Sequence, residues 1–469
     1  MRRDSVAIST GTARFARLLR AIVLIPLWAL PAAACSNDAA VPATNPTLET
    51  PVVGGDGADG SISVTPSTTF QTIDGFGSSQ RMFDDPHLNG LSNTSSTGGM
   101  VMTPAQRDTI YELLYSPIKG IGLNRVRLFF TQPGWQTEEG GRITPDGPYP
   151  GPRATAALDF IRNALRYNPK LQTGFQVLAY DHWINNSTYP IRIAEYVKSS
   201  LDFAKARGYE PQWIGVQNEP SLAGFSVDKI RDIIAELGQM LKADGRYSAR
   251  ISAPDDVTDE LGTAMARTIL ADPPARSFVS SLSIHLYGNV RPSGMAAVSA
   301  EYSLPLWMTE YDSRSGSRDI GWASTIVHEM LVNYNCSAVD ILFGFFGGSD
   351  ANIAYVSLKS TGTTYTGYTL NPSYYQIGHW SKYVTPGAVR IEATSTTPEV
   401  QVSAFVKGGK KVIVLINTSP LNQRSMTIPA GKYRLVQTAM KATDRLADKG
   451  LFTSAVNLPA ESITTLIEQ

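Results

Sequence analysis

Apolar runs alternate with helical patterns along the chain from about residue 73 to residue 385. Short runs rich in β-branched and aromatic residues are typical of buried strands, and apolar residues spaced three and four apart are typical of amphipathic helices. Their regular alternation predicts a parallel α/β fold, and eight strands suffice to close a (β/α)8 TIM barrel. The eight candidate strands are Ile73–Gly77, Asn124–Phe129, Thr173–Ala179, Trp213–Asn218, Arg250–Ala253, Leu282–Tyr287, Leu306–Glu310 and Val339–Phe343.

Two of the intervening helices have clear sequence signals. Thr103-Pro104-Ala105-Gln106 combines an N-cap, a first-turn proline and a capping-box partner, so a helix should begin there. Five apolar residues at helical spacing predict a second helix between the fourth and fifth strands: Ile230, Ile233, Ile234, Leu237 and Leu241.

The helical pattern stops after about Thr385, where short alternating segments separated by Gly, Pro and Asn turns predict an attached antiparallel β-sandwich. Ser61–Val64 precedes the first barrel strand, and we expect it to join this sandwich. The predicted sandwich strands are Val389–Ile391, Val400–Val406, Lys411–Ile416, Ser425–Ile428, Tyr433–Thr438 and Ser462–Leu466.

The N-terminus resembles an export signal. A basic segment precedes the apolar run Ala21–Leu30, and Pro31-Ala32-Ala33-Ala34 places small residues before Cys35. This pattern predicts a bacterial envelope lipoprotein lipidated at Cys35, with plain secretion as the alternative. We therefore divide the chain into a signal (1–35), a disordered tether (36–60), a catalytic barrel (61–385) and a sandwich (386–469).

Composition excludes some function classes. The 469 residues include 41 Lys plus Arg and 41 Asp plus Glu, so no net field favours a nucleic acid. Cys336 is the only cysteine besides Cys35, and we expect it to be a buried apolar residue. No histidine pair has metal-ligand spacing, and no glycine-rich cofactor loop is present. We expect a monomer without cofactor or metal, attached to a membrane only through the lipid.

Two candidate strands end in a glutamate. Val216-Gln217-Asn218-Glu219-Pro220 places one acid at a strand tip, and Trp307-Met308-Thr309-Glu310 places another. The carboxyl ends of barrel strands meet at the catalytic face, and two facing carboxylates can cleave a glycosidic bond. A lone strand-end glutamate is more often solvated or ion-paired, so the hypothesis rests on the pair.

Four polar side chains are candidates to support these acids. Arg127 and Tyr287 can donate hydrogen bonds that hold Glu310 charged, and Asn218 can contact a sugar 2-hydroxyl. His285 shares a strand face with Tyr287 and is either a sugar contact or a hydrogen-bonded wall residue. For Arg127 the alternative is a structural ion pair.

An ordered set of motifs resembles glycoside hydrolase family 30 across roughly residues 61–469. The motifs are Thr72-Ile73-Asp74-Gly75-Phe76-Gly77, Gly120-Ile121-Gly122-Leu123-Asn124-Arg125-Val126-Arg127, the two glutamate motifs, His285-Leu286-Tyr287 and Tyr374-Tyr375-Gln376-Ile377-Gly378-His379. The resemblance implies a retaining β-glycosidase without metal. By matched position, it implies that Glu219 is the acid/base and Glu310 the nucleophile, supported by Asn218, Arg127 and Tyr287.

Two segments depart from the family pattern. Val339–Phe346 carries phenylalanines where the family usually has a tryptophan under the sugar, and Ala179–Trp183 lacks the usual proline-rich form. Glucuronoxylan-cleaving members hold a substrate carboxylate with basic residues, whereas residues 347–375 contain only Lys359. This composition disfavours glucuronoxylan and leaves a neutral β-glucan, a β-galactan or another β-glycoside open, as well as endo or exo action.

Aromatic residues are the remaining candidates for sugar binding. Trp135, Trp183 and the Phe345-Phe346 pair can stack on a pyranose, although ordinary packing is an equal alternative for each, and Trp307 should lie in the core. The missing tryptophan also motivates a rival hypothesis, a surface carbohydrate-binding protein on the same fold with impaired catalysis. The glycosidase hypothesis and the binding-protein hypothesis both imply a carbohydrate ligand.

Overall fold

The computed structural model describes residues 57–80, 100–131, 152–178, 184–288, 291–312, 320–348 and 353–469. The predicted signal, Cys35, most of the tether, His87, Trp135 and Trp183 lie outside these residues. The described residues all belong to one compact unit, Pro46–Gln469. Among their helices, none combines the length and apolar character needed to cross a bilayer.

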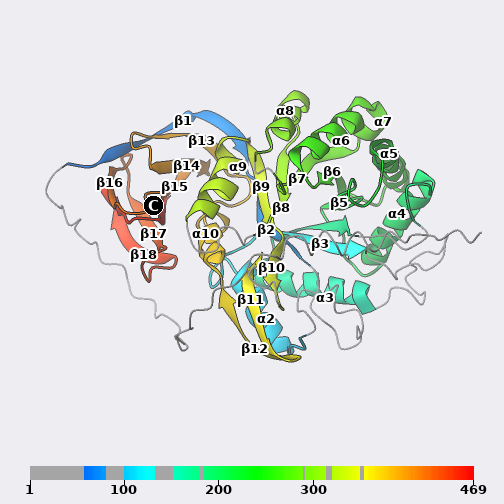
Figure 1. The fold of residues 1–469 in the computed structure, drawn as a ribbon, viewed down its shortest axis with the longest axis horizontal. Helices are drawn as coiled ribbons and strands as arrows, with labels where there is room; N and C mark the ends of the chain where they lie inside the picture. Colours follow the sequence, from blue (N-terminus) through cyan, green and yellow to red (C-terminus); the bar gives the residue numbers. More distant parts are fainter. Residues whose placement is uncertain are drawn as a thin grey trace, which may run out of the picture. The chain divides into compact units, whose positions relative to one another are not determined.

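Eight parallel strands close into a barrel in chain order, which confirms the predicted fold class (Figure 1). Strand β9 pairs back with β2, with Ala338 opposite Gly75, so the sheet has no open edge. The fifth strand extends beyond its predicted end to Asp256. The strands are β2 (Gly75–Gln80), β3 (Arg125–Thr131), β4 (Gln172–Val177), β5 (Trp213–Gly215), β6 (Arg250–Asp256), β7 (Val279–His285), β8 (Leu306–Glu310) and β9 (Cys336–Ile341).

Helices cover the barrel, and the two with sequence signals form as predicted. Thr103 and Gln106 make a reciprocal capping box at the start of α2, and the five predicted apolar residues of α5 are buried. The helices are α2 (Pro104–Tyr115), α3 (Pro152–Tyr167), α4 (Pro190–Ala206), α5 (Val227–Asp244), α6 (Asp259–Ala271), α7 (Pro273–Arg276), α8 (Ser293–Tyr302), the π-helix η4 (Ala323–His328), α9 (Glu329–Val332) and α10 (Pro372–Ser381).

A charged layer fills the barrel beneath the catalytic face. Arg125 on β3 is fully buried between the rings of Trp213 and Trp307, 4.3 and 4.2 Å from their centroids. Its guanidinium pairs with Asp340 on β9 at 3.2 Å. Successive inward positions on a strand are two residues apart, so Arg127 occupies the next layer toward the carboxyl ends. Trp307 is a core residue, as expected.

The sandwich combines the first described strand with the last ones, as predicted. Strand β1 (Gly60–Thr72) pairs antiparallel with β13 and parallel with β16, and Figure 1 shows this blue strand beside the orange ones. The other strands are β13 (Val389–Ser395), β14 (Val400–Lys407), β15 (Lys410–Asn417), β16 (Arg424–Thr427), β17 (Tyr433–Ala439), β18 (Ala447–Phe452), β19 (Ala455–Leu458) and β20 (Ser462–Glu468). The sequence did not predict β18 or β19.

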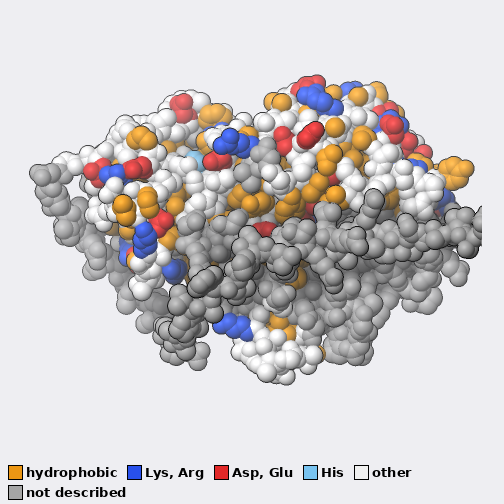
Figure 2. Space-filling model, viewed as in Figure 1, with side chains coloured by type: hydrophobic (Ala, Val, Ile, Leu, Met, Phe, Trp, Pro, Cys, Tyr) orange, Lys and Arg blue, Asp and Glu red, His pale blue; other side chains and the backbone are white. Residues whose placement is uncertain are grey.

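A buried histidine joins the barrel to the sandwich. His379 on α10 is fully buried, and its Nδ1 and Nε2 lie 2.8 and 2.9 Å from the hydroxyls of Thr465 and Thr438 on the sandwich. His379 is therefore a structural residue. Charged side chains of both signs are interspersed on the visible face of the described residues (Figure 2).

A three-stranded sheet after the barrel was not predicted. The predicted eighth strand, Val339–Phe343, is interrupted, because β9 ends at Ile341 and a new strand begins at Phe343. Strand β10 (Phe343–Phe346) pairs with β11 (Ala354–Thr361), which forms a hairpin with β12 (Thr364–Leu370) before α10. This break resets which side chains of the following strand point toward the core.

Candidate active site

The two predicted acids meet at the carboxyl end of the barrel. Glu310 is the last residue of β8, and Glu219 follows β5, where its backbone N–H donates to Asp255 O at 3.0 Å. A carboxylate oxygen of each glutamate and a ring nitrogen of His285 all lie within 4.8 Å of one another. The two carboxyl groups are therefore close enough to flank one bound group from two sides.

Arg127 donates hydrogen bonds to four other residues of this site. Its Nε and Nη2 donate to Asp255 Oδ2 at 3.0 and 2.6 Å, and Nη2 also donates to Asn218 Oδ1 at 2.6 Å. Its Nη1 donates to Ser79 Oγ at 2.8 Å and to Glu310 Oε2 at 3.0 Å. These bonds account for all five N–H groups of a guanidinium, which fixes its plane. Arg127 is thus both an ion-pair partner and a support for Glu310.

Glu310 is held by donors on both oxygens. Tyr287 Oη donates to Oε1 at 3.1 Å, while Arg127 donates to Oε2. Burial raises the pKa of Glu310, and the positive charges of His285 and Arg127 oppose that rise. Burial also raises the pKa of Tyr287 far above its ordinary value, so its hydroxyl keeps the proton that it donates. The two donors stabilise the charged form of the Glu310 carboxyl group.

His285 is a wall residue that bridges two acids. It is fully buried, with Nδ1 3.0 Å from Glu219 Oε1 and Nε2 3.4 Å from Asp255 Oδ1. Burial lowers its pKa, but the charge of Glu310 and the hydrogen bonds to Asp255 and Glu219 outweigh burial and raise the pKa to about 10. The ring is therefore an imidazolium at neutral pH. Its burial leaves it no surface for a sugar contact.

Asp255 belongs to the site but was not predicted. It accepts from Arg127 and from the Thr309 hydroxyl, and it is buried. Burial raises its pKa, yet Arg127 and His285 prevail and hold the pKa well below its ordinary value. The sequence carried only a weak signal, because Asp255 follows Ile251-Ser252-Ala253-Pro254, a short run interrupted by a serine and a proline. The predicted strand stopped too early, at Ala253.

Three side chains of the site are spaced closely enough to bind a metal ion, but the positive charges around them disfavour a cation. Glu219, His285 and Glu310 each present one ligand atom. However, Arg127 already neutralises Glu310 from 3.0 Å, and a protonated His285 has no lone pair for a cation. The donors instead suit two carboxylates that flank an electron-poor anomeric carbon.

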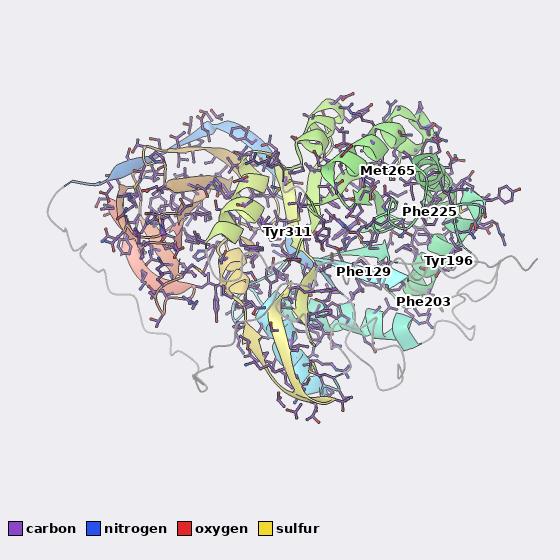
Figure 3. All side chains as sticks on the ribbon, viewed as in Figure 1. Phe129, Tyr196, Phe203, Phe225, Met265 and Tyr311 are labelled. Atoms are coloured by element: carbon purple, nitrogen blue, oxygen red, sulfur yellow. The ribbon has the colours of Figure 1, made fainter. Side chains whose placement is uncertain are left out.

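The phenylalanine prediction needs a correction. Phe345 is fully buried and packs against Phe160, with ring centroids 6.1 Å apart, so it cannot stack on a sugar. Phe346 is only partly buried and stacks on Phe343 at 4.6 Å, within an apolar cluster that includes Phe129. Phe129 lies on β3 (Figure 3). The Arg127 guanidinium lies over its ring, 4.9 Å from the centroid. Trp135 and Trp183 lie outside the described residues.

A parallel eight-stranded barrel with a β-sandwich, and two opposed glutamates at the strand tips, defines a class of carbohydrate-active proteins. The sandwich, at residues 387–466, matches the glycosyl hydrolase family 30 beta sandwich domain. The C-terminal sandwich is therefore of the family 30 type, in line with the resemblance that the motifs indicated.

Several relatives are similar over long stretches. Glucuronoxylanase XynC from Bacillus subtilis (strain 168) is 25% identical over 438 residues, covering 87% of this chain and 91% of that enzyme. A Caenorhabditis elegans protein named as glucosylceramidase 2 is 26% identical, over 61% of this chain, and the match spans only 57% of that relative.

Solved structures support the same fold. An endo-β-1,6-glucanase superposes with a TM-score of 0.68 at 21% identity, covering 87% of this chain and 93% of that one. The catalytic domain of family 30 xylanase C from Talaromyces cellulolyticus gives a TM-score of 0.67 at 18% identity, covering 87% and 100%. At such identities the likeness establishes architecture.

Proposed function

We propose that the protein hydrolyses β-glycosidic bonds with retention of configuration, with Glu310 as nucleophile and Glu219 as acid/base. The observation that carries the proposal is the pair of carboxylates within 4.8 Å, set in unlike surroundings. Glu310 accepts from Arg127 and Tyr287, which favours a standing anion. Glu219 accepts from His285 on Oε1, which leaves Oε2 to carry a transferable proton.

The proposed reaction has two balanced steps. A Glu310 oxygen attacks the anomeric carbon while Glu219 protonates the departing glycosidic oxygen, which yields a glycosyl ester and a free alcohol. Glu219 then removes a proton from water, whose oxygen displaces Glu310 and restores the β-anomer. Arg127 and Tyr287 hold the leaving carboxylate in the second step. His285 keeps Oε1 occupied, so that the proton moves on Oε2 throughout.

Two variants test this assignment. In Glu310→Gln the first step fails, so turnover should fall by about a thousandfold or more on every substrate. In Glu219→Ala, dinitrophenyl glycosides should still form the glycosyl ester, and azide should restore turnover as a β-glycosyl azide. Glu260→Gln, on the exposed surface of α6, is the matched control. A first product of inverted configuration by proton NMR would refute the double displacement.

We propose a neutral β-glycan or β-glycoconjugate as substrate class. The only basic residue between 347 and 375 is Lys359, so no arginine fork is available there for a uronic acid. The named relatives comprise a glucuronoxylanase and a glucosylceramidase, and the solved structures an endo-β-1,6-glucanase and a xylanase. Product release from β-1,6-glucan, β-1,6-galactan, xylans and aryl β-glycosides distinguishes these classes. Preferred turnover of glucuronoxylan would contradict the proposal.

The second candidate is a binding protein with impaired catalysis, favoured only by the phenylalanines that replace the family tryptophan. Binding of a β-glycan by calorimetry, with no reducing ends released during long incubation, would support it.

We also propose export to the bacterial envelope, with a lipid on Cys35, supported by the small residues before that cysteine. Mass spectrometry of the mature N-terminus tests it. An unmodified N-terminal residue would exclude the lipid.

A further inference from the structure

Asp256 lies beside the site without facing the reacting atoms. It directly follows Asp255 on β6, and neighbouring residues of a strand point to opposite faces. Asp255 faces Arg127, whereas Asp256 is fully buried on the other side. Its Oδ2 accepts from the Ser221 hydroxyl at 2.5 Å, and its Oδ1 accepts from Val257 N–H at 2.9 Å.

Ser221 lies in the loop that carries Glu219, two residues after it. The loop folds on itself, because Ala223 N–H donates to Glu219 O at 2.9 Å and Phe225 N–H donates to Pro220 O at 3.0 Å. Asp256 is a side-chain partner from another strand that holds this turn. It is buried, so water does not compete for the bond.

The loop holds Glu219 in an unfavourable backbone conformation. Glu219 has φ of +47°, in the left-handed region that residues with a Cβ rarely adopt. Asp255, whose carbonyl accepts from Glu219 N–H, also has a positive φ of 62°. Such conformations persist only where the surrounding structure fixes them. If the turn relaxed, rotation about φ would swing the Glu219 carboxyl away from Glu310.

We infer that Asp256 is a positioning residue for Glu219, which through Ser221 holds the left-handed turn that aims the acid at the departing oxygen. This inference rests on the proposed function and deepens it. A residue that only positions the acid affects the step in which a proton is transferred. It leaves the attack of Glu310 and the binding of the sugar unchanged.

This role predicts a dependence on the leaving group. Phenyl glycosides need a proton on the departing oxygen, whereas dinitrophenolate leaves without one. Ser221→Ala and Asp256→Asn should lower kcat/KM for phenyl β-glycosides about tenfold to hundredfold. The loss on dinitrophenyl β-glycosides should stay within about threefold. Ser226→Ala is the matched control, because Ser226 lies in the same loop and caps α5 without contacting Asp256.

The experiment separates positioning from misfolding. Covalent labelling with a dinitrophenyl 2-deoxy-2-fluoroglycoside counts the competent sites, to which all rates are normalised. Equal losses on both substrates after normalisation, or no loss on either, would overturn the inference. Asp256→Asn can fail to fold, and Ser221→Ala then carries the test. If Glu219→Ala shows azide rescue while these variants lack leaving-group dependence, the inference alone fails. If Glu219→Ala shows neither the glycosyl ester nor rescue by azide, the proposed function fails.

Discussion

Two N–H groups of Arg127 donate to the same oxygen of Asp255, at 3.0 and 2.6 Å, in a pair that is almost fully buried. The remaining three N–H groups reach Ser79, Glu310 and Asn218. One side chain thereby sets the positions of the Glu310 carboxylate, the Asn218 amide and the buried Asp255. A point charge could neutralise Asp255, but only the planar fork satisfies all these acceptors.

Arg127→Lys should therefore be damaging although it keeps the charge. An ammonium offers three donors for these four acceptor atoms, so at least one acceptor loses its partner. Breaking a buried ion-pair network costs about 3–5 kcal/mol of unfolding free energy. We expect that loss in urea unfolding, with kcat lowered about a hundredfold or more because Glu310 is no longer held.

The surface variant Arg166→Lys is the control, since Arg166 is mostly exposed and lies 3.4 Å from Asp108. Near-normal turnover in Arg127→Lys would show that charge alone suffices at this position.

His379 should make the protein sensitive to acid. Burial lowers its pKa from 6.5 to about 3, so the unfolded chain binds a proton more readily than the folded protein. Stability contributed by the neutral ring is present above pH 6.5 and is lost as the pH falls from 6.5 toward 3. Each such histidine adds a slope of about 1.4 kcal/mol per pH unit in this window.

Burial also lowers the pKa of His328, to about 4, so its contribution to stability is likewise lost as the pH falls. His379→Gln should lower the unfolding free energy at pH 7, because the bonds to Thr438 and Thr465 weaken. The substitution should also reduce the slope of the unfolding free energy against pH, because about one proton fewer is taken up on unfolding. Urea unfolding between pH 5 and pH 7 measures that slope, and an unchanged slope would contradict the assignment.

Phe345 and Phe346 should respond differently to the same substitution. Phe345→Ala leaves a cavity in the core and should cost about 3–5 kcal/mol of unfolding free energy, with little effect on KM once folded. Phe346→Ala removes a partly exposed ring and should raise KM about threefold to tenfold, with a smaller loss of stability. Calorimetry and initial rates on both variants test this contrast. Equal changes in KM would mean that neither ring meets the sugar.

Much of the barrel could be predicted because its strands are apolar runs and its helices have caps. Strands β10 to β12 were missed for a physical reason. The segment Thr364–Leu370 is rich in Thr, Tyr and Gly, and its residues are mostly exposed, so no apolar pattern marks it. Strands β18 and β19 are likewise short and mixed in polarity. Their positions depend on hydrogen bonds to strands distant in sequence.

The glutamates were predictable because each ends an apolar run, whereas Asp255 and Phe345 were not. Pro254 lies within β6, and a proline in a central strand normally argues against extending the strand past it. Phe345 and Phe346 are neighbours, so the phase of β10 decides which ring faces the core. That phase is reset by the break at Leu342, where Leu342 N–H donates to Tyr311 O, a contact that local sequence does not reveal.

The pairing of β1 with β13 and β16 has a consequence for biosynthesis. In the nascent chain, β1 leaves the ribosome long before its partners β13 and β16, which lie far later in the sequence. The sandwich can close only once β20 has been synthesised and has joined β15 and β17. Until then the strand exposes unpaired backbone groups, the condition under which chaperones and export factors engage a polypeptide.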